Sequence, residues 1–390
     1  MSPVRADVER KLGPLVDRVV ALAEINSGSF NPDGVDRVGE RLGDFTATLE
    51  PDSLESIAVD PTPVLDASGI RTSRRVGSAI RATKRQDAPF QICLFGHLDT
   101  VFPEDHSFQS VVRDGRLLRG PGVADCKGGL VIAMEVLAQI EQSELADRIG
   151  WEFLVVPDEE IGSSGSKRLF AGSASRADIG LGFEPALPSG GVAGARKGTI
   201  TGHLVVHGTA AHVGRAHSEG RSAILALSQL IVRLEALNAH DGVTANCGRV
   251  SGGGPLNVVP DLAVGSFNMR IEAARHEQLV VEEFESAVAD CPLGVDLVWG
   301  PTRPPKVRTP GLEHLLSVLA ASAADLGLDV PVEDTGGCCD GNDFAAAGLA
   351  NVDSLGIRGG SIHSEHEFAE IDSIPERVAL VTELVQRMAS

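Results

Sequence analysis

Between Phe90 and Ile179, short apolar runs alternate with a segment of helical periodicity, and this alternation constrains the fold more than any other feature of the chain. Gln91–Phe95 and Trp151–Val156 have the length and apolar content of buried strands, whereas Gly128–Gln139 carries apolar residues at helical spacing. This order is typical of a mostly parallel sheet with helices on both faces. We therefore predict an α/β fold whose chemistry lies at the carboxyl ends of the strands.

Polar clusters follow each of these apolar runs. Gly96–Asp99 follows the first run, Pro157–Glu160 follows the second, and Ile179–Phe183 leads directly to Glu184. Zinc binds histidine nitrogen and carboxylate oxygen, and consecutive acids repel each other unless a cation or a proton compensates them. The clusters together predict a metal site, although each one alone also fits a loop histidine or a solvated acidic turn.

A glycine-rich loop, Arg119–Gly129, precedes the predicted helix. Such a loop can bind an anion at a helix N-terminus, but it lacks the spacing of both common phosphate-binding motifs. Its one acid, Asp125, lies where a carboxylate could bridge two cations.

The chain has 390 residues, more than one hydrophobic core usually supports, so two domains are expected. Between about Thr199 and Gly300 the pattern changes to βαββαβ, the order of a small ferredoxin-like α+β domain. Gly190-Gly191 and the prolines from Pro301 to Pro305 are candidate hinges. We predict a catalytic domain of residues 1–192 and 306–390, with an inserted lid and dimerisation domain of residues 193–305.

The formal charge of −20 disfavours nucleic acid and anionic membrane surfaces as partners, which leaves a small-molecule substrate. Met1–Glu24 has the pattern of an amphipathic helix, not of a signal peptide, and no apolar run reaches the ~20 residues of a membrane span. A cytoplasmic location is expected. The six cysteines have no C-x-x-C spacing, which argues against a disulfide framework or a cysteine zinc site.

Three segments in order, Gly96–Val101, Gly120–Asp125 and Asp158–Ser163, resemble the co-catalytic zinc peptidases that include bacterial glutamate carboxypeptidase, acetylornithine deacetylase, succinyl-diaminopimelate desuccinylase and aminoacylase. Glutamate carboxypeptidase is the most similar of these. Later segments agree in the same order: Phe183–Pro185, Gly208–Gly214, Asn257–Pro260 and Gly359–Ser364. The resemblance spans nearly the whole chain.

By matching position, the resemblance implies two Zn²⁺ ions per chain. His97 and Glu184 would bind one ion, Glu160 and His363 the other, and Asp125 would bridge both. Co²⁺ or Mn²⁺ would fit similar ligands. His366 lies close enough in sequence to His363 to be a rival ligand.

The resemblance also implies catalytic roles for Glu159, Asp99 and His212. Glu159 would be the general base. Asp99 would accept the second ring N–H of the metal-binding His97 and fix its orientation. His212 would reach the site of a neighbouring subunit and stabilise the oxyanion, which makes a homodimer the expected assembly.

Arg270 and Asn257 match residues that hold the terminal carboxylate of the substrate in relatives, a role that suits the planar fork of arginine. Relatives also have a cis peptide after the bridging aspartate, so Asp125-Cys126 is expected to be cis. In the turn Gly336–Phe344 the family commonly has serine or threonine before the aspartate, and Cys339 stands there instead.

The function predicted is di-zinc hydrolysis of an amide bond next to a free carboxylate, as in a glutamate carboxypeptidase-like exopeptidase. An N-acyl amino acid deacylase, which uses the same metals with another acyl pocket, is the alternative. A catalytically inactive metal-binding scaffold is a third possibility; it would predict loss of Glu159 or of a ligand, and none is lost.

Overall fold

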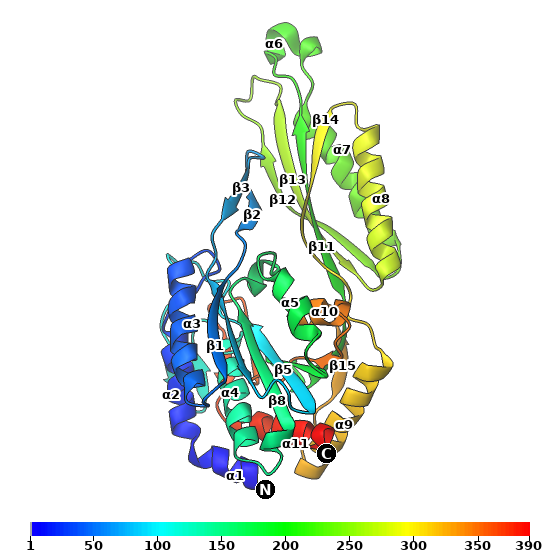
Figure 1. Ribbon diagram of the computed structural model, residues 1–390. Coiled ribbons are helices and arrows are strands. Elements are labelled where there is room, and N and C mark those ends of the chain that lie inside the picture. Colours follow the sequence, from blue (N-terminus) through cyan, green and yellow to red (C-terminus); the bar gives the residue numbers. More distant parts are fainter. Residues whose placement is uncertain (1) are drawn as a thin grey trace.

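The computed structural model describes residues 2–390 and has two parts (Figure 1). The main part is the larger one, at the bottom of the view, and contains both termini. The upper part rises from it and ends in the short helix α6 (Val213–Ala216). Among residues 2–390, no helix is both long enough and apolar enough to cross a membrane.

A six-stranded sheet in the order β1-β4-β8-β5-β9-β16 forms the centre of the main part. The four strands from β8 to β16 are parallel, and β4 and β1 extend the sheet in antiparallel pairing. The prediction of a mostly parallel α/β sheet is confirmed. In sheet order, the strands are Ser53–Ala58, Ser78–Lys84, Ile149–Val156, Phe90–His97, Ile179–Gly182 and Asn351–Val352.

Helices cover both faces of this sheet, and β5 shows why. Its alternate side chains point to opposite faces: Ile92 and Leu94 belong to one apolar cluster, and Cys93 and Phe95 to another. The first cluster includes residues of α1 (Pro3–Arg10), α2 (Leu12–Ala23), α3 (Pro32–Ala47), α4 (Lys127–Glu141), α9 (Pro310–Leu326) and α11 (Ser373–Ala389). The second includes residues of α5 (Lys167–Ala174) and α10 (Asp340–Ala346).

The N-terminal segment differs from the single amphipathic helix predicted. It forms two helices, α1 and α2, separated at Lys11. Pro14 explains the break, because a proline has no N–H to donate to the carbonyl of Arg10 and its ring would clash with that carbonyl in a continuous helix.

The upper part has the βαββαβ order that the sequence predicts. Its antiparallel sheet has the order β12-β13-β11-β14, and α7 and α8 pack on it around a second apolar cluster. Its elements are β11 (Gly198–His207), α7 (Ala223–Glu235), β12 (Val243–Gly252), β13 (Leu262–Ile271), α8 (Ala274–Asp290) and β14 (Gly294–Arg303). Strand β13 begins at Leu262, after Pro260, which has no N–H for the ladder.

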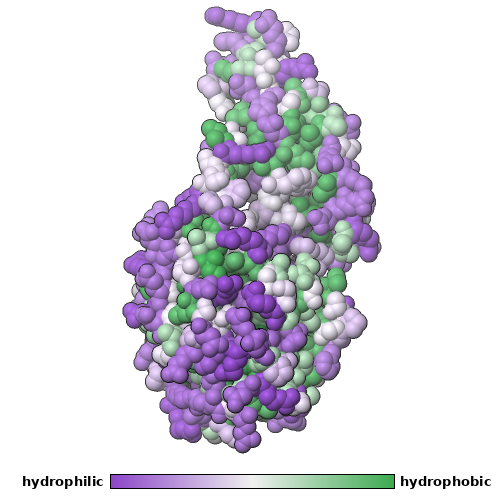
Figure 2. All heavy atoms as spheres, in the orientation of Figure 1, coloured by the Kyte–Doolittle hydropathy of each residue, from purple (hydrophilic) through white to green (hydrophobic). Residues whose placement is uncertain are grey.

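Two connections join the parts. β10 (Val192–Arg196) pairs in parallel with β15 (Val332–Thr335), and the backbones of Arg196 and Lys306 exchange hydrogen bonds. Separately, the hairpin of β2 (Thr62–Leu65) and β3 (Arg71–Arg74) reaches up to the upper sheet, where Leu65 packs with residues of β11 and β13. Hydrophilic side chains cover much of the main part, whereas apolar ones are prominent on the visible face of the upper part (Figure 2).

Candidate metal centre and active site

The carboxyl ends of three parallel strands bring the predicted ligands together. β5 ends at His97, the turn after β8 carries Glu159 and Glu160, and Glu184 follows β9. Asp125 comes from the loop before α4. His363 comes from the loop between β17 (Gly359–Gly360) and β18 (Phe368–Glu370). Because the carboxyl ends of parallel strands lie at one edge of the sheet, these residues meet at the edge where the sequence predicts the chemistry.

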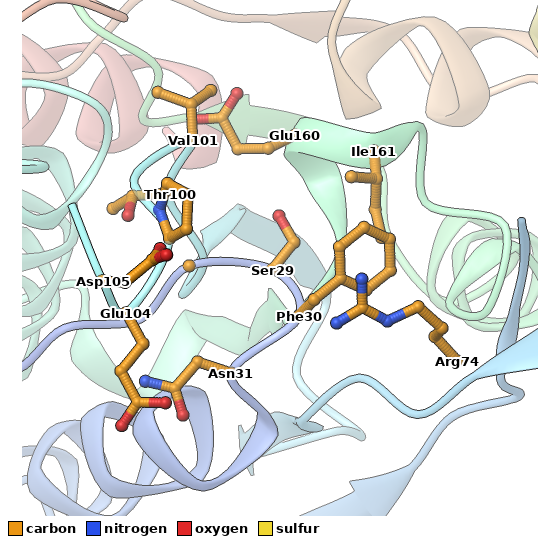
Figure 3. A pocket seen from close by; sticks show the side chains of 12 residues that line it. Ser29, Phe30, Asn31, Arg74, Thr100, Val101, Glu104, Asp105, Glu160 and Ile161 are labelled. Carbon is orange, nitrogen blue, oxygen red and sulfur yellow. The ribbon is translucent and has the colours of Figure 1, made fainter. Parts of the chain in front are cut away.

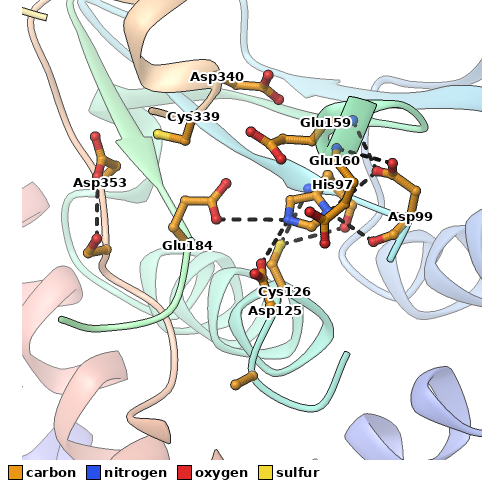
Figure 4. Close-up of polar contacts among 12 residues, drawn as sticks. His97, Asp99, Asp125, Cys126, Glu159, Glu160, Glu184, Cys339, Asp340 and Asp353 are labelled. Atoms are coloured by element: carbon orange, nitrogen blue, oxygen red, sulfur yellow. Dashed lines mark hydrogen bonds and ion pairs between the residues drawn. The ribbon is translucent and has the colours of Figure 1, made fainter. Parts of the chain in front are cut away.

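Two groups of potential ligands share Asp125: one adds His97 and Glu184 (Figure 4), and the other adds Glu160 and His363. Oδ1 of Asp125 lies 3.1 Å from His97 Nε2, which is also 3.8 Å from Glu184 Oε2. Oδ2 of Asp125 lies 3.2 Å from His363 Nε2, which is 3.2 Å from Glu160 Oε2. One carboxylate therefore presents one oxygen to each group, as a carboxylate that bridges two cations would.

The electrostatics of these groups favour a cation. Burial, together with the charge of Asp125, raises the pKa of Glu160 to about 8. Hydrogen bonds to Asp125 and Glu160 raise the pKa of His363 to about 10. Buried Glu184 Oε1 has no hydrogen-bond partner among the described residues. Buried carboxylates without enough donors are costly, and divalent cations satisfy oxygen and nitrogen donors of this kind.

Asp99 lies completely buried beneath the two groups. Its carboxylate accepts the N–H groups of Glu159 and Glu160 at 3.1 and 3.2 Å, and the hydroxyl of Ser29 at 2.7 Å. The closest acceptor for His97 Nδ1 is the backbone oxygen of Asp99 at 3.0 Å; the carboxylate oxygen is at 3.4 Å. The carboxylate thus chiefly fixes the turn that carries the two glutamates, and either acceptor leaves Nε2 of His97 directed at the metal groups.

Glu367 supports the loop that carries Asp125, and the sequence analysis missed it. Its buried carboxylate accepts three backbone N–H groups, from Gly122 at 3.0 Å, Ala124 at 2.9 Å and Asp125 at 3.0 Å. Burial raises its pKa to about 7. Gly122 has φ = 74°, a conformation that favours glycine, and the Asp125-Cys126 peptide is cis, as the family resemblance implied.

His363 is held in an unusual backbone conformation, with φ = 61°. This left-handed region is uncommon for residues other than glycine, and such residues cluster at functional sites. In the part of the chain that the structure describes, the histidines in the two groups are His97 and His363; the exposed His366 belongs to neither. The geometry favours His363 over its rival.

Arg303 is a second residue that the sequence analysis missed. Its Nη1 lies 2.5 Å from Glu159 Oε1, and the arginine side chain is only 2% exposed. The prolines from Pro301 to Pro305 were predicted as a hinge, which would have placed Arg303 in a linker, whereas β14 continues to Arg303. The only signal in the sequence was an arginine directly before the Pro304-Pro305 pair.

Two cavities meet at Glu160. The first, of about 390 Å³, is lined by the metal groups and by Arg270, whose Nη1 donates to Cys338 Sγ at 2.9 Å. The second, of about 810 Å³, is lined by Phe30, Arg74 and Glu104 among others (Figure 3). In it the guanidinium of Arg74 stacks 4.0 Å from the centroid of the Phe30 ring.

The other two predicted substrate and oxyanion residues lie elsewhere. His212 is exposed at the start of α6, at the far end of the upper part from the strand ends of β5 and β8, and its Nδ1 accepts the Gly214 N–H (Figure 1). Asn257 is exposed in the loop before β13 and accepts the Val213 N–H through its backbone oxygen. A single chain thus brings Arg270 to the metal groups, but not His212 or Asn257.

Cys339, the departure from the family pattern, is buried at the N-cap position of α10. Its N–H donates to Asn342 Oδ1 at 3.1 Å in a capping box. A cysteine is therefore accommodated at this turn without displacing any residue of the two groups.

Residues 93–387 match the model of peptidase family M20/M25/M40. The chain is 28% identical over 313 residues to carboxypeptidase G2 of Pseudomonas sp. (strain RS-16), covering 77% of this chain and 74% of that protein. It is 27% identical over 392 residues to succinyl-diaminopimelate desuccinylase of Variovorax paradoxus (strain S110), covering 92% and 96%. Its fold is similar to that of an M20 family metallo-carboxypeptidase from Sulfolobus solfataricus, with TM-score 0.78, 15% identity and coverage of 95% and 98%.

Proposed function

The chain belongs to peptidase family M20/M25/M40, whose members are metal-dependent hydrolases of amide bonds, and we propose that it cleaves an amide bond next to a free carboxylate with two zinc ions. The observation that carries the proposal is the pair of ligand groups that share Asp125. Three carboxylates against two divalent cations leave one positive charge for the substrate. His97 and Glu184 would hold one ion, and Glu160 and His363 the other.

Glu159 is the proposed general base. Two bound cations would lower the pKa of a water molecule between them and polarise the scissile carbonyl. Glu159 lines the same cavity as the two groups, so its carboxylate can take the proton of that water and return it to the leaving nitrogen. Asp99 orients this step by holding the N–H groups of Glu159 and Glu160.

The two cavities suggest how a substrate lies. Arg270 would bind the free carboxylate in the smaller cavity, because its present partner is the sulfur of Cys338, a weak acceptor that a carboxylate can replace. With the scissile bond at Glu160, the acyl or aminoacyl group would enter the larger cavity beside Phe30 and Arg74. A glutamate-like side chain is our first choice for the carboxylate half, and a neutral N-acyl amino acid is the second.

We propose that residues 193–305 act as lid and dimerisation domain, with residues 1–192 and 306–390 as the catalytic domain. Their separate apolar clusters support this division. His212 and Asn257 would then serve the site of the partner in a homodimer. Leu225 and Val232 lie two turns apart on α7 and are 60% and 74% exposed, which supports a protein contact there.

A mixing experiment tests the dimer. His212→Ala and Glu159→Gln chains, each expected to be inactive, should regain activity as heterodimers, because one hybrid site would be intact. No recovery in proven heterodimers would show that His212 does not act in trans. The cytoplasmic location stays a prediction.

The test of the activity itself is a screen of C-terminal glutamate dipeptides, N-acetyl and N-succinyl amino acids with the zinc-loaded protein. Hydrolysis of the dipeptides supports the exopeptidase, and hydrolysis of only the N-acyl compounds supports the deacylase. The similarity to a succinyl-diaminopimelate desuccinylase over nearly the whole chain also favours the deacylase. Glu159→Gln should keep the metal and lose ~10² to 10⁴-fold in turnover. If none of these substrates is hydrolysed, the result would favour the third hypothesis, a catalytically inactive metal-binding scaffold.

A further inference from the structure

Arg303 is the last residue of β14 but lies inside the main part, among three carboxylates. Its Nη1 donates to Glu159 Oε1 at 2.5 Å, and its Nη2 donates to Asp340 Oδ1 at 2.9 Å. Nη2 also contacts the hydroxyl of Ser163 at 2.7 Å and the backbone oxygen of Glu159 at 3.2 Å. Nε lies 3.3 Å from Asp343 Oδ2, in an ion pair without hydrogen-bond geometry. Each nitrogen of the guanidinium therefore faces protein oxygen.

These contacts fix one side of the Glu159 carboxylate and leave the other side for chemistry. Oε1 is bound to Arg303, and Arg303 holds the backbone oxygen of the same glutamate. Glu159 still lines the cavity of the metal groups (Figure 4). A glutamate held at two points has few side-chain rotamers, so its second oxygen is directed without a search among conformations.

Contacts from α10 hold Arg303 in place beside the site. The side-chain amide of Asn342, in α10, donates to the backbone oxygens of Lys197 and Pro304. These two residues lie where the chain passes from the main part to the upper part and back. Asp340, which binds the guanidinium, lies in the same helix and is 1% exposed. Although Arg303 belongs to β14, α10 anchors it to the main part.

We propose that Arg303 is a positioning residue that holds the carboxylate of Glu159 for proton transfer, an inference that rests on the proposed role of Glu159 as general base. A role in binding the carboxylate of the substrate fits the structure less well. Arg303 is 2% exposed and has a carboxylate partner at each terminal nitrogen, whereas Arg270 has one sulfur partner in the cavity.

Arg303→Lys tests this role, because lysine keeps the charge but cannot bind Glu159 and Asp340 as a planar fork. We expect kcat to fall by ~10²-fold, the loss typical of a small displacement of a catalytic group, while KM changes less than about twofold. Metal content, measured by elemental analysis, and the visible spectrum of the Co²⁺-loaded protein should stay those of wild type. Arg303→Met should have a still lower kcat, so that lysine rescues in part.

Arg85→Lys is the matched control. Arg85 forms a bidentate pair with Glu141 at the other end of β4 and β8, outside the site, so it reports the general cost of replacing a paired arginine. It should leave both kcat and KM unchanged. If Arg303→Lys does not fold, Ser163→Ala removes one anchor of the guanidinium and should lower kcat by a smaller factor with KM unchanged.

Three results would overturn the proposal. The first is an unchanged kcat in Arg303→Lys, or in Ser163→Ala if the lysine variant does not fold. The second is an effect on KM alone, which would make Arg303 a substrate-binding residue, and the third is loss of metal from the variant. Wild-type protein that hydrolyses none of the substrates contradicts the proposed function instead. The two failures are therefore distinguishable.

Discussion

Metal binding should compete with protons at His97 and His363, because neighbouring carboxylates favour the protonated form of both rings. Hydrogen bonds to Asp125 and Glu160 raise the pKa of His363 to about 10. Burial of His97 opposes its protonation, yet its acidic neighbours, Glu184 and Asp125 among them, keep its pKa well above the ordinary value. These contacts favour the imidazolium form of both histidines in the metal-free protein. An imidazolium must lose the proton on its Nε2 before that nitrogen can bind a cation.

Lowering the pH stabilises the protonated, metal-free site, and metal binding therefore becomes weaker. Below the pKa of each histidine, the affinity for its ion should fall by at least about tenfold for each pH unit, because the histidine releases one proton for each ion bound. At the group of Glu160 and His363 the fall should be steeper below about pH 8, because Glu160, whose pKa is about 8, must lose a proton as well. Competition with a chelating indicator between about pH 6 and pH 8 measures this slope, and calorimetry in buffers of different ionisation enthalpy counts the protons.

His363→Ala is the variant to compare, and His366→Ala is its control, since His366 is exposed and outside both groups. The first should lose one ion for each chain together with the protons released by its binding; the second should bind as wild type does. An affinity independent of pH, or equal behaviour of the two variants, would refute the reasoning.

Three further predictions concern residues with different contacts. Glu367→Gln should weaken metal binding ~10 to 100-fold in the same competition assay, because the carboxylate holds the loop of Asp125; wild-type affinity would contradict this. Arg270→Ala should reduce kcat/KM for free-acid substrates by ~2 to 5 kcal/mol and hardly at all for amidated ones, and equal losses would remove Arg270 from carboxylate recognition. Burial opposes ionisation of Glu141, but Arg85 outweighs it and lowers the pKa from 4.5 to about 2. The ionised Glu141 therefore stabilises the folded protein above pH 4.5, and this stabilisation is lost as the pH falls through about 2. The pKa shift corresponds to about 3 kcal/mol in the free energy of unfolding, which screening by solvent reduces to about 1 to 2 kcal/mol. Urea unfolding should show that Glu141→Gln lowers the free energy of unfolding by that amount at pH 7 and leaves it unchanged at pH 2. An equal loss of stability at both pH values would contradict this prediction.

The parts of the fold that the sequence predicted are those governed by local pattern. β5 and β8 are predominantly apolar runs because both of their faces are buried. The polar residues directly after them, such as His97 and Glu160, were predicted with them, since their placement depends only on where each strand ends.

β14 shows where local pattern fails. The prolines from Pro301 to Pro305 indicated a hinge, yet the strand runs through Pro301 to Arg303. β14 is an edge strand, and its pairing with β11 shifts register at this point, between Ile200 and Gly202. A proline is tolerated at such a place because its missing N–H lies outside a regular ladder.

Glu367 and Arg303 were missed for a related reason. Each acts through partners more than 100 residues away, Glu367 on the loop of Asp125 and Arg303 on Glu159. Nothing in the spacing of neighbouring residues signals such a contact. It becomes visible only when the fold has brought the two segments together.

The count of bound metal ions tests the central claim most directly. Protein purified without chelator and loaded with Zn²⁺ should contain two ions for each chain by elemental analysis, and Asp125→Ala should contain none, because Asp125 serves both groups. Chelation should abolish hydrolysis, and Zn²⁺ or Co²⁺ should restore it. Metal-free protein that remains active in chelator, or an Asp125→Ala variant that keeps both ions, would contradict the account.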